Sequence, residues 1–138
     1  MTDTERAILL DLVDTTRIEF TAATWPLGHG LIHGDAWAGN LLWDTTRPPH
    51  TQALLGDWDW AGIGPRKVDL IPTWHAAIRY GRDQAWVNDF IDTYRYDLTD
   101  YPDGYHLLRR MRDLVQLSGP LRRSSTSPQH GCEKHPTS

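Results

Sequence analysis

The sequence has little cysteine, no long apolar run and no excess of positive charge, and each shortage removes a class of protein. A single cysteine, Cys132, excludes a disulfide scaffold and a zinc site made of several cysteines. No stretch approaches the roughly 20 apolar residues of a membrane-spanning helix, and the N-terminus lacks the features of a secretory signal. Fourteen Lys and Arg against 18 Asp and Glu give a net charge of −4, which offers no general attraction for nucleic acid. We therefore expect a cytoplasmic protein with no membrane or nucleic-acid partner.

The apolar residues that are present predict a mostly helical α+β fold. The 138 residues, 39% of them apolar, suffice for one small domain or one lobe of a larger protein. A long helix is expected over residues 5–23, followed by short strands that form a small hairpin carrying residues 31–57. Apolar residues at helical spacing predict three further helices as far as about residue 117: Ile71, Trp74 and Ile78; Val87, Phe90, Ile91 and Tyr94; and Leu107, Met111, Leu114 and Val115.

Residues 118–138 differ from the folded unit expected over residues 1–117. They are rich in serine, threonine and proline, and Leu121 is their only aliphatic residue. Such a segment buries too little apolar surface to offset the entropy lost on ordering, which predicts a disordered tail.

Two polar segments flanked by short apolar runs carry the residues of chemical interest. In the first, Asp35 and Asn40 stand five residues apart on a loop between two apolar runs, and in the second, Asp57 follows another apolar run. Phosphoryl transfer from ATP requires such a set. One carboxylate orients the attacking hydroxyl and accepts its proton, while an Asn and a second Asp hold Mg²⁺ against the phosphates.

The motifs in these segments resemble those of a known family. The chain reads His-Gly-Asp-x4-Asn from His33, Asp-Trp-Asp from Asp57, and Gly-x4-Asp-Leu from Gly64. Together they resemble the catalytic and metal-binding motifs of the aminoglycoside phosphotransferase family, which has a protein-kinase-like fold and includes choline kinase and homoserine kinase relatives. The resemblance is dense over residues 30–70 and implies the large C-terminal lobe of that fold, with the hairpin carrying the catalytic and metal loops.

The resemblance implies a role for each matching residue. Asp35 would be the catalytic base, and Asn40 and Asp57 would bind Mg²⁺. Asp69 would open the following helix and support the catalytic loop from below. The implied reaction transfers a phosphoryl group from ATP or GTP to a hydroxyl of a small molecule. Gly34 favours a small molecule over a protein, since protein kinases carry here an Arg that contacts activation-loop phosphate.

Other residues near the motifs have a structural and a functional interpretation. His33 is expected to bond nearby backbone and support the catalytic loop, whereas Asp59 is either a helper of metal binding or a solvated acid. Trp58, Trp60 and Trp74 are expected in the core rather than beneath a substrate. Five downstream acids form a solvated face or line a pocket for a cationic substrate: Asp89, Asp92, Asp97, Asp100 and Asp103.

Two features depart from the family pattern. Gly56 stands where the family usually has an aliphatic residue before the metal-binding Asp. The small lobe of a kinase supplies a Gly-rich strand and a strand lysine, but the lysines here are Lys67, after the metal motif, and Lys134, in the expected tail. We therefore expect a truncated chain that is inactive alone and whose N-terminal nucleotide-clamping lobe is missing or is a separate partner.

Two other functions remain open at this point. A metal-dependent hydrolase would take its metal ligands from a set of five residues: His29, His33, Asp35, Asp57 and Asp59. This alternative does not explain Asn40 or Asp69. A non-catalytic, kinase-like interaction lobe would bind a partner through the surface that a small lobe normally covers. Metal dependence distinguishes the three, because the kinase needs Mg²⁺ with nucleotide, the hydrolase a transition metal alone, and the interaction lobe neither.

Overall fold

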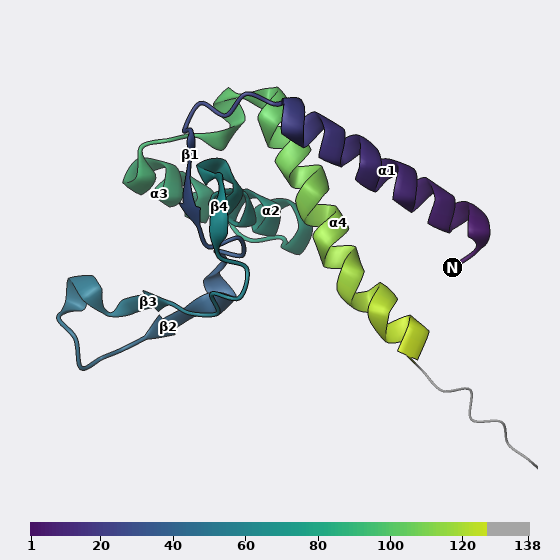
Figure 1. The fold of residues 1–138 in the computed structure, drawn as a ribbon. Coiled ribbons are helices and arrows are strands. Elements are labelled where there is room, and N and C mark those ends of the chain that lie inside the picture. Colours follow the sequence, from purple (N-terminus) through teal and green to yellow (C-terminus); the bar gives the residue numbers. More distant parts are fainter. Residues whose placement is uncertain (127–138) are drawn as a thin grey trace, which may run out of the picture.

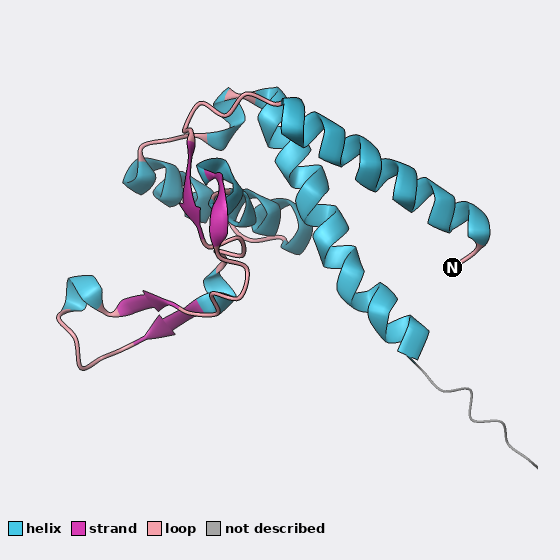
Figure 2. Cartoon of the chain, in the orientation of Figure 1, coloured by secondary structure: helices cyan, strands magenta, loops and turns pink. Residues whose placement is uncertain are grey.

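The computed structural model describes residues 1–126, which form four α-helices and two small antiparallel sheets (Figures 1 and 2). The helices are α1 (Asp3–Ala22), α2 (Ile71–Tyr80), α3 (Gln84–Tyr94) and α4 (Pro102–Thr126). The strands are β1 (His29–Ile32), β2 (Leu41–Trp43), β3 (Ala53–Leu55) and β4 (Gly62–Pro65). This is the mostly helical α+β composition that the sequence predicts. Within residues 1–126, no helix combines the length and apolarity needed to cross a bilayer.

The β2–β3 pair is a hairpin within the segment where the sequence predicts one, and it projects away from the helices (Figure 1). β1 pairs antiparallel with β4, so that Gly30 faces Gly64 and Ile32 faces Gly62. The sequence pattern predicts only helices after the 31–57 hairpin, so the strand β4 is an element that it misses. Two glycines and Pro65 disfavour a helix there, and the strand is defined by pairing with a segment far away in the sequence.

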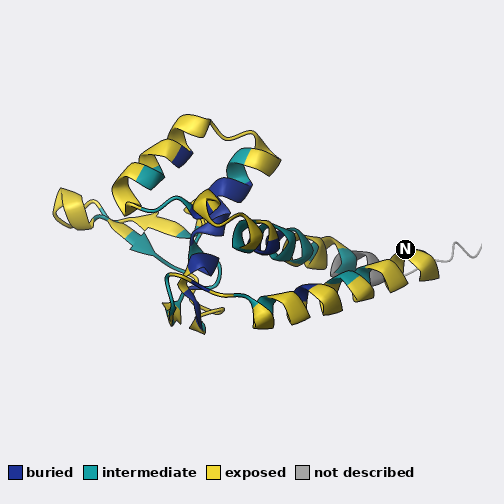
Figure 3. Cartoon of the chain, turned by 90° about the horizontal axis from the view of Figure 1, so that it is seen from above, coloured by how far each residue is buried: buried dark blue, intermediate teal, exposed yellow. Residues whose placement is uncertain are grey.

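Helix α1 begins with a capping box and packs along one side only. The Thr2 side chain accepts a hydrogen bond from the Glu5 backbone, and the Glu5 carboxylate accepts one from the Thr2 backbone. Toward α4, Thr16 is buried and Phe20 packs against the core, whereas Ile18 is 70% exposed. Most of the helix is exposed in Figure 3.

The core lies where α2, α3 and α4 meet. Its most deeply buried apolar side chains come from these helices, from the residue before α2 and from the turn before α4: Leu70, Ile71, Trp74, Val87, Leu98 and Leu108. Pro72 lies in the first turn of α2, where its missing N–H removes no helical hydrogen bond. The predicted stripes are therefore buried near the centre of the bundle, but Ile78, Tyr94 and Val115 near or beyond its edge are exposed.

The last helix extends beyond residue 118, where the sequence predicts the start of a disordered tail. Residues 118–126 continue α4, which includes Pro120. Proline removes one helical hydrogen bond and usually ends a helix, so the local sequence predicts an earlier end. The rest of the expected tail, residues 127–138, lies outside the described residues.

Lys67 is enclosed beneath two tyrosines. The residue is 1% exposed, and its ammonium nitrogen lies 4.1 Å from the ring centroid of Tyr101 and 5.3 Å from that of Tyr96. Nζ has no hydrogen-bond partner among the described residues. Burial lowers the pKa of Lys67, and the Asp100 carboxylate opposes this shift only in part. An enclosed lysine of this kind is not available to bind a nucleotide phosphate.

We expect Tyr96 to make the protein less stable in alkali. Burial, with smaller contributions from Tyr101, Asp100 and Asp97, raises the pKa of Tyr96 to about 12 from its ordinary value of 10.0. Between these values the folded chain keeps a proton that the unfolded chain has lost. The free energy of unfolding should therefore fall as pH rises, by at most about 1.4 kcal/mol per pH unit from this group.

Urea denaturation between pH 9 and pH 12 measures this slope. Tyr96→Phe should make it shallower, whereas the control Tyr80→Phe, at a residue that is 64% exposed, should leave it as in the wild type. Equal slopes in the wild type and Tyr96→Phe would contradict the assignment.

Candidate active site

Asp69 anchors the loop that follows β1. One carboxylate oxygen accepts a hydrogen bond from the backbone N–H of His33 at 2.7 Å, and the other accepts one from Gly34 at 2.8 Å. Asp69 ends a short 3-10 turn, Arg66–Asp69, that leads directly into α2. The loop is thereby attached to the most buried helix, and the contact with its backbone that the sequence predicts for Asp69 is present.

His33 supports the same loop from its other side. The residue is 2% exposed, and Nε2 lies 2.8 Å from the carbonyl oxygen of Gly56. Nδ1 accepts a hydrogen bond from the Asp35 backbone N–H at 3.3 Å, a pattern that assigns the ring proton to Nε2. Both ring nitrogens are therefore occupied by backbone groups, as expected for a structural histidine.

Gly34 is required by the shape of the loop. Its φ of +81° lies in the left-handed region, and a Cβ atom there would lie 2.6 Å from the backbone oxygen of Trp60. A side chain at this position would force apart the loop and the segment that precedes β4.

Asp35 and Asn40 meet across the loop. The Asn40 Nδ2 donates to the Asp35 backbone oxygen at 2.9 Å and to the Asp35 Oδ2 at 3.3 Å. Asn40 ends the short 3-10 turn Ala38–Asn40, which turns its side chain back toward Asp35. Its Oδ1 makes no hydrogen bond within the described part of the chain and stays available to a ligand.

Arg112 of α4 is a site residue that the sequence analysis missed. Its Nη1 donates to the Asp35 Oδ1 at 2.5 Å, and its side chain is only 9% exposed. The contact joins residues 77 positions apart, so no local motif reveals it. A signal was available in α4, because Arg112 lies one helical turn from the buried Leu108 and therefore on the packed face.

The residue before Asp57 is bonded to Asn40. The N–H of Gly56 donates to the Asn40 carbonyl at 2.8 Å, which fixes the backbone immediately before Asp57. Gly56 holds this position through its backbone, and a Cβ there would lie 3.1 Å from the Leu42 side chain, so the departure from the family pattern does not disrupt the contact. Asp57 itself is exposed, has a φ of +58°, and makes no hydrogen bond or ion pair within residues 1–126.

The oxygens of Asn40 and Asp57 fit a hard divalent cation. A carboxylate and an amide oxygen are ligands that Mg²⁺ accepts, together with phosphate and water oxygens. Asp59 lies in an exposed turn and has no partner among the described residues. In that part of the chain no group of three His, Cys, Asp or Glu residues is placed to hold a metal, and the ring of His33 is fully engaged, so the ligand set of the hydrolase alternative is not brought together.

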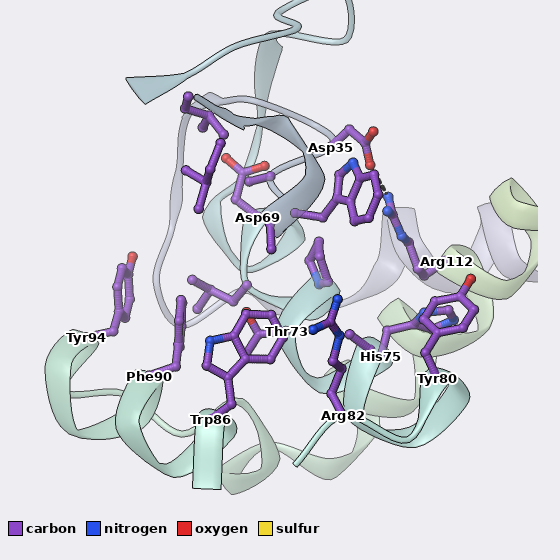
Figure 4. Close-up of a pocket in the computed structure, with 18 of the residues that line it drawn as sticks. Asp35, Asp69, Thr73, His75, Tyr80, Arg82, Trp86, Phe90, Tyr94 and Arg112 are labelled. Carbon is purple, nitrogen blue, oxygen red and sulfur yellow. Dashed lines mark hydrogen bonds and ion pairs between the residues drawn. The ribbon is translucent and has the colours of Figure 1, made fainter. Parts of the chain in front are cut away.

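Two pockets meet at Asp35 and Arg112. The first has a volume of about 900 Å³ and lies between the loop that follows β1 and α2–α3 (Figure 4). We call it the aromatic pocket, after Trp37, Tyr80, Trp86, Phe90 and Tyr94 in its lining. The second, of about 850 Å³, lies between α1 and α4. Asn40 and Asp57 line neither pocket, so the cation ligands expected from the sequence lie outside both.

Two of the three tryptophans expected in the core lie at the surface. Trp58 is 50% exposed and Trp60 is 70% exposed, whereas Trp74 is buried as predicted. Trp58 packs edge-on against His33, with ring centroids 4.7 Å apart, and donates a hydrogen bond to the Leu55 oxygen. Trp60 lines the second pocket. These residues flank the catalytic loop and do not fill the interior.

The chain matches the phosphotransferase enzyme family (APH) over residues 4–109. The match includes the loop of Asp35 and Asn40, the segment of Asp57, the Asp69 contact and nearly all of the first three helices. The chain belongs to this family, which confirms the resemblance inferred from its motifs. Neither a curated protein nor a solved structure matches it at a significant level.

We expect Asp69→Asn to lower the free energy of unfolding by about 2 kcal/mol. The amide removes the charge that strengthens both backbone hydrogen bonds and leaves one N–H without an acceptor. Urea denaturation followed by tryptophan fluorescence measures the change. Asp89→Asn, on the exposed side of α3, is the control and should change stability by less than about 0.5 kcal/mol. Similar small effects of both substitutions would contradict the role of Asp69.

Proposed function

We propose that the chain takes part in ATP-dependent transfer of a phosphoryl group to a hydroxyl of a small molecule. The observation that supports this most is the pair of contacts at Asn40: its side-chain amide nitrogen bonds Asp35, and its backbone carbonyl accepts a hydrogen bond from Gly56, the residue before Asp57. One asparagine thus connects the expected base with the expected cation ligands. Membership of the phosphotransferase family supports the reaction class.

In this mechanism the acceptor hydroxyl lies against the Asp35 carboxylate. Hydrogen bonds from Arg112 and Asn40 hold the carboxylate, and each oxygen keeps further acceptor capacity for the hydroxyl. As the hydroxyl oxygen bonds to the γ-phosphorus, its proton passes to Asp35. The bond between that phosphorus and the β-phosphate oxygen breaks, and ADP leaves with the electron pair.

Asn40 and Asp57 would hold Mg²⁺ through the Asn40 Oδ1 and the Asp57 carboxylate. When bound, Mg²⁺ neutralises charge on the phosphates. The left-handed backbone of Asp57 is uncommon for a residue other than glycine and is of the kind found at functional sites. Asp59, two residues further on, is the candidate helper of metal binding.

The nucleotide needs contacts beyond those that residues 1–126 offer. Of the two lysines in the sequence, Lys67 is enclosed by tyrosines and Lys134 lies outside the described residues. We propose that the chain is the large lobe of a kinase-like enzyme. A small lobe, covalently attached or separate, would complete the site for ATP or GTP.

A non-catalytic interaction lobe is the second candidate, and the hairpin favours it. On β2, Leu42 is 59% exposed and Trp43 is 66% exposed. Leu54, which pairs with Leu42 from β3, is partly buried. An apolar patch of this kind is typical of an interaction surface. The two candidates differ in their need for Asp35: phosphoryl transfer requires its carboxylate as the base, whereas an interaction lobe has no reaction that depends on it.

We expect the 138-residue chain alone to bind Mg-ATP weakly and to transfer no phosphoryl group. A small lobe from the phosphotransferase family, fused or added in trans, should restore transfer from radiolabelled ATP to hydroxyl compounds. Asp35→Asn in the restored enzyme should lower the transfer rate by about 10²–10⁴-fold, because it removes the general base.

Asp89→Asn is the matched control, since its side chain lies on an exposed face away from both pockets. Transfer that survives Asp35→Asn unchanged would disprove the mechanism. Tight binding of a small lobe with no transfer to any acceptor would favour the interaction lobe.

A further inference from the structure

Among the charged side chains that line the aromatic pocket, both acids have partners and two of the arginines have no ion-pair partner among the described residues. Asp35 is bonded to Arg112, and Asp69 is engaged by two backbone N–H groups. By contrast, Arg66 and Arg82 make no ion pair within the described part of the chain. The pocket therefore presents two unpaired guanidinium groups and no free carboxylate.

Arg82 is the better placed of the two guanidinium groups to bind a ligand. It follows Gly81, the left-handed residue that ends α2, and its side chain rises into the pocket beside Trp86 (Figure 4). Its guanidinium carbon lies 5.7 Å from the Trp86 ring centroid, a cation–π contact that supports the side chain without neutralising it. The next residue, Asp83, uses its carboxylate to cap α3 through the Ala85 N–H at 2.9 Å.

The second pocket at Asp35 offers no free carboxylate either. Its charged lining residues are Asp35 and Arg112, which pair with each other, and Arg17, which pairs with the exposed Asp14. The acids that the sequence analysis considered for a cationic substrate line neither pocket: Asp89, Asp92, Asp97, Asp100 and Asp103. A polycationic acceptor therefore finds no set of opposite charges beside the expected base.

We propose that the acceptor is an anionic hydroxyl compound with an apolar or aromatic body, bound in the aromatic pocket with its oxyanion on Arg82. This proposal rests on the proposed function only in assuming that the hydroxyl of the bound compound is the group that is phosphorylated. The guanidinium fork suits a carboxylate or a phosphate ester, which share the chemistry of two coplanar acceptor oxygens. Trp86 and Phe90 form one wall for the apolar body, and Asp35 faces the pocket from the opposite side (Figure 4).

The charge of the ligand is tested without nucleotide, on the full chain. The probes are 4-(hydroxymethyl)benzoate, 4-(hydroxymethyl)phenyl phosphate, the neutral 4-(hydroxymethyl)benzamide and the cationic 4-(aminomethyl)benzyl alcohol. Titration calorimetry and tryptophan fluorescence measure binding, because Trp37 and Trp86 line the pocket. We expect one or both anions to bind at least about tenfold more tightly than the neutral and cationic probes, and the stronger anion identifies the oxyanion.

Arg82→Gln should weaken binding of the preferred anion by about tenfold or more, since it removes a charged hydrogen-bond donor. The control Arg6→Gln removes the same charge at an exposed residue of α1 that lines neither pocket, and it should leave binding unchanged. The probe series on the wild-type chain keeps the test valid even if Arg82→Gln fails to fold.

Two results would overturn the proposal: equal or tighter binding of the cationic probe, or equal loss of binding in Arg82→Gln and Arg6→Gln. Because binding is measured without ATP, its outcome is separate from that of the transfer assay. Anion binding without transfer in the restored enzyme would leave the pocket assignment standing and reject the proposed function. Asp35-dependent transfer to cationic acceptors would support the proposed function and reject the pocket assignment.

Discussion

The two hydrogen bonds from the backbone of His33 and Gly34 to Asp69 are the contact on which the site depends. They satisfy two loop donors whose loss would cost about 1–3 kcal/mol each if buried and unpaired. They also attach the loop to the start of α2, the most deeply buried helix. The direction of Asp35 follows from this anchor, because its backbone is fixed one residue later by the ring of His33.

Arg112 gives the site a second constraint, which comes from the opposite end of the chain. By pairing with Asp35 it holds the carboxylate at the junction of the two pockets, and it neutralises the one acid that a cationic ligand would otherwise meet there. The same contact connects α4 to the catalytic loop. One partly buried ion pair therefore orients the Asp35 carboxylate and neutralises its charge, while Arg66 and Arg82 make no ion pair among the described residues.

The parts of the site that the sequence could predict are local. Asp35 and Asn40 are five residues apart on one loop, and the position of Asp69 within a family motif indicated its contact with that loop. The parts that it could not predict depend on distant partners. β4 is a strand because it pairs with β1, and Arg112 reaches Asp35 across 77 positions. The extension of α4 through Pro120 runs against local propensity, which is why the sequence placed the end of the helix too early.

Hydrogen exchange of individual backbone amides tests the central claim most directly. If Asp69 anchors the catalytic loop, the N–H groups of His33 and Gly34 exchange slowly, with protection close to that of the buried first turns of α2. The amides of the exposed loop between β2 and β3, such as Thr45, provide the unprotected reference within the same molecule. Slow exchange at His33 and Gly34 is the predicted result. Exchange at the rate of Thr45 would show that the loop is not held by Asp69 and would contradict the account.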